Sequence, residues 1–323
     1  MPLPLLSLAP SLTPRPWGGE CLLALLGKEI PLGETSIGES WELSDHPDGP
    51  STISGGPFDG RFFGDLVRER PMEMIGCPQA PEKFPLLVKY IDASEDLSIQ
   101  VHPDDEYTQN NNLPDRGKTE CWYIMDCGRK TEIIYGVLPG TTRAILEDAI
   151  AQGSVPEVVN RYPLHPGDFL FVPPGTIHAI LGGTLLCEIQ QSSNITYRLW
   201  DWNRKPEREL HIKESLDVTQ YNNETLPKPY CLPKPSPEQV ALIPLTTNDF
   251  FEVNAALLDA GNSMVLEQPG HGFILNTVSG EGTVDGEEIK TGSTFYVPAC
   301  IEKVVLKAET PLTVLVTKSN ELG

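Results

Sequence analysis

The stretch PGDFLFVPPGTIH, residues 166–178, carries the strongest fold signal in this chain. The apolar run after Gly167 is typical of a strand, a Pro-Pro-Gly turn ends it, and His178 follows. A second copy of this frame occurs at residues 291–303, TGSTFYVPACIEK. In both copies five residues separate a glycine from a proline, and the same spacing then leads to His178 or Lys303. The chain therefore contains two related β-units.

The rest of the chain also favours strands joined by turns. It contains 31 prolines and 28 glycines in 323 residues, which suits many short strands better than long helices. Helical patterns occur within residues 57–76 and 141–160, and we interpret the polar residues 104–118 as a loop. We predict a mainly β protein with a few short helices. The predicted organisation is a first β-unit at residues 1–204, a Pro- and Lys-rich linker at 205–239 and a second β-unit at 240–323.

Charge and cysteine content exclude several classes of partner. The formal net charge of −21 repels nucleic acid and anionic lipid surfaces, so we expect neither as a partner. We find no apolar run that approaches the roughly 18 residues of a membrane span. The seven cysteines form no CxxC pair, which predicts free thiols and a cytoplasmic location. We expect a monomer or a weak homodimer.

Comparison of the two β-units separates structural residues from functional candidates. When the units are overlaid, Glu120 falls on Gly272 and His178 falls on Lys303, so the second unit lacks both polar groups. Upstream, LSIQVHPDD at residues 97–105 alternates apolar with polar residues and places Gln100 and His102 on one strand face. Two imidazoles, a carboxylate and an amide carbonyl suit a divalent ion such as zinc. We therefore predict a metal site made by Gln100, His102, Glu120 and His178.

Each of these residues has an ordinary structural explanation when it is taken alone. A Gln-x-His pair is most often a solvated strand face, and a histidine after a Pro-Pro-Gly turn often caps that turn. Two histidines and one carboxylate also suit non-haem iron, which leaves an iron oxygenase as an alternative. A non-catalytic ligand sensor or partner-binding module is a third possibility. The joint occurrence of the four residues within one repeated frame favours a catalytic metal site.

Several stretches together resemble type I mannose-6-phosphate isomerase (phosphomannose isomerase) in its short bacterial form. They are RPWGG at 15–19, GESWELSDHP at 38–47, LSIQVHPDD at 97–105, GKTE at 117–120, PPGTIHA at 173–179 and YRLWDW at 197–202. The resemblance implies two cupin-type jelly-roll barrels, the second without a metal. It also implies a zinc-dependent isomerase that interconverts mannose 6-phosphate and fructose 6-phosphate, with a phosphorylated sugar as its small-molecule partner.

The resemblance also implies roles for individual residues. Gln100, His102, Glu120 and His178 take the zinc positions, and Arg198 takes the position of the catalytic arginine. Residues in the positions that line the sugar pocket are Lys118, Glu188 and Lys89. Ser98 falls where a serine helps to hold the phosphate, and the basic phosphate contact maps to Arg204 or Lys205. Trp17 is a candidate for the wall of the sugar site or for the core.

The implied reaction moves one proton between C2 and C1 of the sugar through an enediolate. Negative charge builds on the sugar oxygens, so the site needs a cation there and a base beside the carbon-bound proton. Arg198 stays protonated and suits charge stabilisation better than proton abstraction. Glu188, Lys118 and a metal-bound water are all candidates for the base, and the sequence does not rank them.

Overall fold

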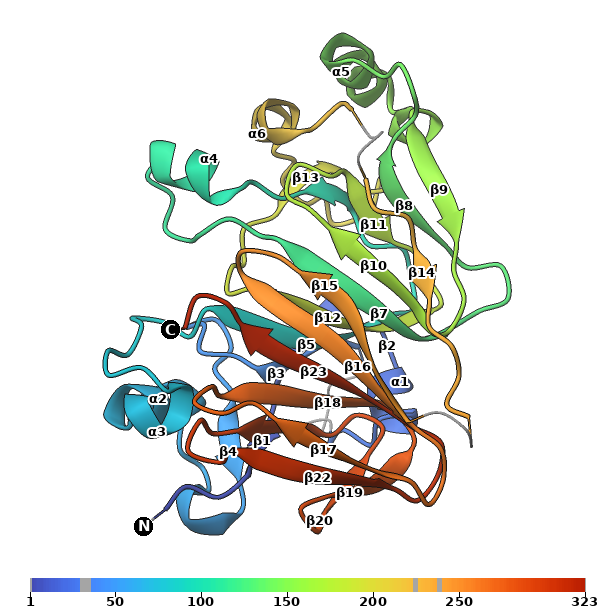
Figure 1. Ribbon diagram of the computed structural model, residues 1–323. Helices are drawn as coiled ribbons and strands as arrows, with labels where there is room; N and C mark the ends of the chain where they lie inside the picture. Colours follow the sequence, from blue (N-terminus) through green and yellow to red (C-terminus); the bar gives the residue numbers. More distant parts are fainter. Residues whose placement is uncertain (1, 30–35, 223–225, 237–239, 323) are drawn as a thin grey trace.

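The computed structural model describes residues 2–29, 36–222, 226–236 and 240–322. Strands make up most of the regular structure in these residues and form four sheets, which stack as layers (Figure 1). This arrangement confirms the mainly β prediction. Within the described residues, no helix has both the length and the apolarity that crossing a membrane requires.

Two antiparallel sheets that face each other are built from strands between Ser11 and Cys231, and we call this part of the protein the first half. The inner sheet contains, in spatial order, β14 (Tyr230–Cys231), β10 (Asp168–Val172), β7 (Glu120–Cys127), β12 (Thr184–Gln191), β5 (Leu86–Ala93), β2 (Ser11–Gly19) and β3 (Ile37–Leu43). The outer sheet contains β13 (Tyr197–Trp200), β6 (Ile99–Val101), β11 (His178–Ile180), β8 (Glu132–Val137) and β9 (Val159–Pro163). The space between these two sheets holds the candidate site.

The other two sheets repeat the arrangement. They are built from strands between Ala241 and Ser319 together with two strands from the start of the chain, and we call this part the second half. Its inner sheet contains β15 (Ala241–Thr247), β16 (Phe251–Leu258), β23 (Leu312–Ser319), β18 (Phe273–Ser279), β21 (Thr294–Val297), β1 (Leu6–Ala9) and β4 (Thr52–Ser54). Its outer sheet contains β17 (Ser263–Glu267), β22 (Lys303–Ala308), β19 (Glu281–Val284) and β20 (Glu287–Lys290). Leu6 of β1 pairs with Tyr296 of β21, so strands from the start of the chain extend the second half.

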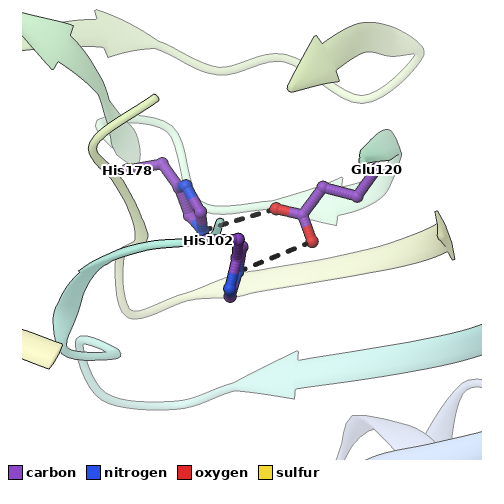
Figure 2. A group of neighbouring side chains, drawn as sticks. All are labelled: His102, Glu120 and His178. Carbon is purple, nitrogen blue, oxygen red and sulfur yellow. Dashed lines mark ion pairs between the residues drawn. The ribbon is translucent and has the colours of Figure 1, made fainter. Parts of the chain in front are cut away.

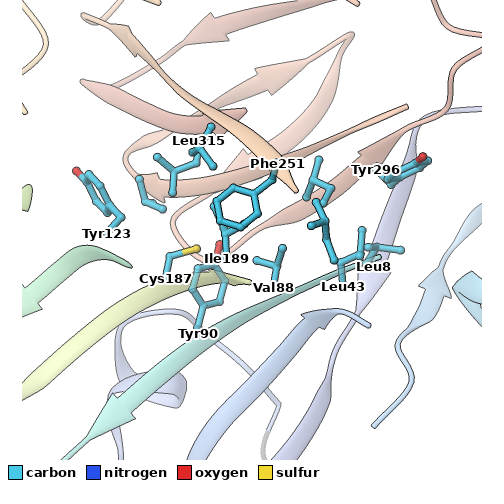
Figure 3. Packing of buried hydrophobic residues seen from close by; sticks show 14 of the residues in the cluster. Leu8, Leu43, Val88, Tyr90, Tyr123, Cys187, Ile189, Phe251, Tyr296 and Leu315 are labelled. Atoms are coloured by element: carbon cyan, nitrogen blue, oxygen red, sulfur yellow. The ribbon is translucent and has the colours of Figure 1, made fainter. Parts of the chain in front are cut away.

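The two inner sheets pack against each other across the central hydrophobic core. Tyr90 and Ile189 of the first half meet Phe251 and Leu315 of the second half there (Figure 3). Strands β5 and β12 are buried along their whole length because both of their faces are covered. Alternate residues of these strands therefore face different layers, and the residues that point away from the central core enter the interior of the first half.

Short helices connect the strands. They are α1 (Cys21–Ala24), α2 (Phe63–Glu69), α3 (Pro71–Ile75), α4 (Asp105–Asn110), α5 (Arg143–Gln152) and α6 (Ile212–Val218). The segment 205–239 contains α6, and its strand β14 pairs with β10 of the first half. The domain boundaries drawn from the sequence stay a prediction.

Helix α4 lies inside residues 104–118, which we expected to be a loop, so that expectation was wrong for part of the segment. Asp104 caps the helix by accepting a hydrogen bond of 2.8 Å from the backbone N–H of Tyr107. Asp105 and Glu106 follow in the first turn, where negative charge favours a helix. The acidic residues that suggested a solvated loop are therefore helix-start residues.

Candidate metal centre and cavity

The inner sheet of the first half places three charged side chains on its interior face. Glu120, Lys89 and Glu188 have the same strand parity as the interior residues Trp122, Ile91 and Leu186. Glu188 lies opposite Lys89 on β5 and opposite Trp122 on β7. Because Cys187 and Ile189 point into the central core, Glu188 between them points into the space between the two sheets of the first half.

The outer sheet supplies the opposite wall. Gln100 of β6 pairs in register with His178 of β11 on one side and with Arg198 of β13 on the other. Ser98 and His102 flank Gln100 on the same segment, and His102 is buried. Residues from distant parts of the chain are therefore neighbours across this sheet.

His102, Glu120 and His178 converge between the two sheets, as Figure 2 shows. Their ligand atoms all lie within 4.8 Å of one another, and all three residues are buried. Nε2 of His178 lies 3.3 Å from Oε1 of Glu120, and Nε2 of His102 lies 3.9 Å from Oε2. Among the described residues, this is the group of His, Cys, Asp and Glu side chains arranged to hold a metal ion.

Both imidazoles are prepared to act as ligands. The Nδ1 atom of His102 lies 2.8 Å from the carbonyl oxygen of Ile195, and Nδ1 of His178 lies 2.9 Å from that of Thr176. A proton on Nδ1 can be donated to each carbonyl, which leaves the Nε2 lone pair facing Glu120. Burial lowers the pKa of His102 well below its usual value and that of His178 to about 4. The neutral form, which binds metals, is therefore favoured.

Glu120 has the environment of a carboxylate that needs a cation. Both of its oxygens are buried; Oε1 accepts no hydrogen bond from the described residues, and Oε2 faces the ammonium of Lys118. Burial raises the pKa of Glu120 to about 8, and the nearby ammonium of Lys118, 2.6 Å from Oε2, only partly opposes this effect. A divalent cation would supply the missing positive charge, so the donor set fits a metal.

Gln100 reaches the same centre. Its amide nitrogen lies 3.2 Å from Nε2 of His178, and its oxygen faces the hydroxyl of Ser98 at 3.5 Å. To present the oxygen to a cation, the amide group turns by half a rotation about its last bond. The four residues predicted as ligands are therefore gathered at one place.

Charged groups of alternating sign lead from the metal centre toward the cavity mouth. Lys118 lies 3.5 Å from Glu188, and Lys89 lies 3.4 Å from Glu188 and 3.9 Å from Glu39. Arg15 then holds Glu39 with two hydrogen bonds of 3.0 Å. Burial opposes ionisation of Glu188, but Lys118 and Lys89 outweigh it and lower the pKa of this carboxyl group. The same neighbours keep each charge paired although the side chains are buried.

These groups line a cavity of about 450 Å³. Its walls carry five cationic side chains, Arg15, Lys89, Lys118, Arg198 and Arg208, against two carboxylates, Glu39 and Glu188. This local excess of positive charge contrasts with the net charge of −21 for the chain. The cavity is therefore suited to an anionic ligand.

Arg198 of β13 also lines the cavity. The Nε–H of Arg198 donates to the hydroxyl of Ser98 at 3.2 Å, and Nη1 donates to the carbonyl oxygen of Glu209 at 2.8 Å. Burial lowers the pKa of Arg198, and the nearby Arg208 adds to this effect. Trp17, predicted for a wall or for the core, lines the cavity and is also buried.

Two of the residues predicted to bind substrate do not line the cavity. Arg204 turns away and donates to Asp201 at 2.9 Å and to the carbonyl oxygen of Asp96 at 2.6 Å. Lys205 is largely exposed and pairs with Glu207. Arg208 lies at the cavity instead, where its Nε–H donates to Asp201 at 2.8 Å. Position along the chain favoured the nearer cations, but both arginines bind Asp201, and the further bond of Arg204 to Asp96 holds it away from the cavity.

Arg15 and Glu39 were given no role from the sequence, although both lie in stretches that carried the resemblance, RPWGG and GESWELSDHP. The signal for Glu39 was a charged residue in a strand that is buried throughout, whereas Arg15 lies in a partly exposed strand and gave no such signal. Arg15 belongs to β2 and Glu39 to β3, and these strands pair at the edge of the inner sheet. The edge of this sheet therefore contributes to the cavity wall.

Comparison with known proteins relates the whole chain to one group of enzymes. Residues 5–132 match the family model described as phosphomannose isomerase type I, catalytic domain. The chain is 37% identical over 280 residues to mannose-6-phosphate isomerase ManA of Bacillus subtilis (strain 168), covering 85% of this chain and 86% of that protein. It is 34% identical over 313 residues to the mannose-6-phosphate isomerase of Streptococcus mutans, covering 94% and 95% of the two chains.

Solved structures give the same relationship. The crystal structure of the mannose 6-phosphate isomerase from Bacillus subtilis superposes with a TM-score of 0.82 at 31% identity, covering 98% of this chain and 99% of that one. A putative mannosephosphate isomerase from Archaeoglobus fulgidus has a TM-score of 0.77 at 22% identity, which shows a shared fold. The similarity covers both halves of the chain.

Proposed function

This chain belongs to the type I phosphomannose isomerase family, and from that premise we propose how its cavity carries out the isomerisation. The protein is an enzyme that interconverts mannose 6-phosphate and fructose 6-phosphate. The predicted fold, mainly β and of the cupin type, is confirmed by the close structural match. The observation that carries the proposal is the convergence of His102, Glu120 and His178 beside a cavity lined with cations.

We assign the metal site to Gln100, His102, Glu120 and His178, and we propose zinc as the ion. Two neutral imidazoles and a buried carboxylate whose Oε1 accepts no hydrogen bond from the described residues support a borderline-soft divalent cation. When bound, zinc supplies Lewis acidity that stabilises negative charge on sugar oxygens.

The proton transfer is assigned to Glu188 and Lys118. Glu188 is held ionised by Lys118 and Lys89, so it is available to accept the carbon-bound proton. Burial opposes the charged form of Lys118, but Glu120 and Glu188 outweigh it and raise its pKa, so Lys118 stays a proton donor. A positioned acid and base of this kind contribute about 10²- to 10⁴-fold in rate.

Arg198 stabilises the charge that develops on the oxygens of the enediolate. Its guanidinium is fixed by Ser98 and by the carbonyl oxygen of Glu209, so its position costs little reorganisation during the reaction. Because Arg198 remains protonated, it serves the charged intermediate without taking up a proton.

The phosphate of the substrate is assigned to Arg208, Arg15 and Ser98, which line the cavity. Asp201 holds Arg208 and Glu39 holds Arg15, each through Nε and Nη2, so the Nη1 donors remain for a ligand. Trp17 forms part of the wall for the sugar. This arrangement replaces the sequence-based assignment to Arg204 and Lys205.

A coupled assay tests the function directly. Isomerisation of mannose 6-phosphate is followed through conversion of the fructose 6-phosphate product to glucose 6-phosphate and its oxidation by a dehydrogenase. Zinc-loaded protein is expected to turn over, and Arg198→Ala is expected to lose most of the rate. Inactive zinc-loaded protein, or full activity in the variant, contradicts the assignment. Metal analysis of anaerobically purified protein distinguishes zinc from iron.

We further propose that the enzyme works in the cytoplasm as a monomer or weak homodimer. All seven cysteines are free thiols, which supports a reducing compartment. The net charge of −21 supports the proposal that nucleic acid is not a partner. Light scattering across a range of protein concentrations measures the oligomeric state.

A further inference from the structure

The segment 115–119, which carries Lys118 into the cavity, is held by hydrogen bonds and by close packing. The backbone N–H of Gly117 donates to Oδ1 of Asp105 at 2.7 Å, and that of Thr119 donates to Oε1 of Gln191 at 2.8 Å. A Cβ atom at Gly117 would lie 2.4 Å from the backbone nitrogen of Asp105, so the segment packs directly on the start of α4. Its backbone has little freedom to shift.

Arg116 of this segment leaves the first half and binds the second half. Its Nη1 and Nη2 atoms donate to the two carboxylate oxygens of Glu321 at 2.8 and 2.7 Å. Its guanidinium also lies over the ring of Phe250, 5.5 Å from the ring centre. A bidentate pair that also stacks on an aromatic ring fixes direction as well as distance.

The second half presents Glu321 from a well-held turn. The backbone N–H of Glu321 donates to the hydroxyl of Ser319 at 3.2 Å. The backbone N–H of Asn320 donates to the carbonyl oxygen of Phe250 at 3.0 Å, and the Asn320 side chain donates to the carbonyl oxygen of Asn248 at 2.6 Å. These hydrogen bonds connect Glu321 and Phe250, the two partners of Arg116 in the second half.

Arg116 also contacts residues that hold the segment 115–119 or line the cavity. Its Nη2 donates to Oδ2 of Asp105 at 3.0 Å, the residue that holds Gly117. Its carbonyl oxygen accepts a hydrogen bond of 2.7 Å from Ser193, and Ser193 lines the cavity. Lys118 comes two residues after Arg116 in the chain. Its ammonium lies 2.6 Å from Glu120 and 3.5 Å from Glu188.

We propose that Glu321 is a positioning residue for the isomerase site: by holding Arg116, the metal-free second half fixes the segment that carries Lys118. This inference rests on the proposed function of Lys118 as the proton donor. It gives the second half a part in the reaction, although Glu321 touches no reacting atom. Reactions that depend on placement lose rate when a positioned group shifts by a fraction of an ångström.

Amide hydrogen exchange tests the positioning without measuring activity. Glu321→Gln keeps the size of the side chain and removes its charge. The variant is expected to exchange faster in peptides that span residues 115–121 and unchanged in peptides from α2. The matched control is Glu69→Gln, which breaks the exposed pair between Arg61 and Glu69. Equal protection of residues 115–121 in wild type and Glu321→Gln overturns the proposal, even if the wild type has no isomerase activity.

Kinetics then separate positioning from general stability. In Glu321→Gln, kcat is expected to fall about tenfold while KM for mannose 6-phosphate stays within about twofold. The same change in a Lys118→Gln background is expected to have no further effect on kcat, because the side chain that Glu321 positions is already replaced. A fall of equal size in both backgrounds, or unchanged kcat, shows that Glu321 does not act through Lys118. Wild-type protein without activity contradicts the proposed function, and the exchange result then decides the inference alone.

Discussion

Lys118 and Glu188 stand 70 residues apart in the sequence, yet the ammonium of one lies 3.5 Å from the carboxylate of the other. Lys118 comes from the segment before β7, and Glu188 comes from the middle of the neighbouring strand β12. Burial makes this pair costly unless each charge is balanced, and Lys89 and Glu120 supply the balance. A buried array that holds both an acid and a base in their charged forms is suited to moving a proton.

The carboxylate of Glu188 is predicted to be needed for turnover. Glu188→Gln keeps the shape of the side chain but removes the proton acceptor, so kcat is expected to fall about 10²- to 10⁴-fold. Steady-state kinetics with mannose 6-phosphate measure the effect. The control is Glu252→Gln on β16, which lies in the other half and pairs with Lys318. A variant with more than about half of the wild-type kcat contradicts the assignment.

Removal of one imidazole is predicted to abolish metal binding. His178→Ala is expected to retain less than about a tenth of the wild-type metal content after dialysis, because the remaining donors no longer enclose the ion. A chelator should lower the melting temperature of the wild type and leave that of His178→Ala unchanged, since only the folded wild type gains from bound metal. His165→Ala is the control, because this histidine is largely exposed. Full metal content in His178→Ala rules out the site.

Loss of Arg208 is predicted to weaken substrate binding. In Arg208→Ala, KM for mannose 6-phosphate is expected to rise about 10- to 100-fold, the value of one or two charge-assisted hydrogen bonds. Inhibition by inorganic phosphate should weaken in parallel. Lys205→Gln is the comparison, because Lys205 is exposed and does not line the cavity. A larger effect in Lys205→Gln than in Arg208→Ala would restore the original sequence-based assignment.

Glu39 is predicted to make stability depend on acid pH. Burial opposes its ionisation, but Lys89 and Arg15 outweigh this and lower its pKa from 4.5 to about 2. Because the pKa is lower in the folded state, ionised Glu39 stabilises the fold above about pH 4.5, and this contribution disappears as the pH falls toward 2.

Glu39→Gln should therefore be less stable than the wild type at neutral pH, by an amount that shrinks by about 3 kcal/mol as the pH falls through this window. Urea unfolding at a series of pH values measures the difference. Glu252→Gln serves again as the control. A gap between Glu39→Gln and wild type that stays constant with pH contradicts the prediction.

The shared core is predicted to make the two halves unfold together. Phe251→Ala removes a fully buried ring between the inner sheets, and we expect a loss of about 3–5 kcal/mol in the free energy of unfolding. Calorimetry should show one transition that moves to lower temperature as a whole. Two separate transitions, with only one shifted by the substitution, would mean that the central core does not couple the halves.

The residues that we propose as metal ligands could be singled out because their chemistry is local and part of their frame is repeated. His178 follows a turn that recurs at residues 291–303 with Lys303 in its place, and the difference between the copies singled it out. Gln100 and His102 lie two residues apart on one strand face, which period-two alternation reveals. The arginine that we propose for the phosphate was harder to predict. Arg204 and Arg208 both bind Asp201, and the further bond of Arg204 to the carbonyl oxygen of Asp96, which holds it away from the cavity, is a contact between distant residues.

By itself, the sequence determined the strand-rich character of the protein, the residue types of the proposed metal site and the face of each strand on which they lie. These features follow from side-chain chemistry and from the alternation of a strand, both of which act over a few residues. Tertiary structure alone decided which faces meet. The pairing of Lys118 with Glu188, and of Arg116 with Glu321 across 205 residues, depends on how whole sheets pack against each other. Such packing is set by the summed burial of both inner sheets, which no local stretch of sequence contains.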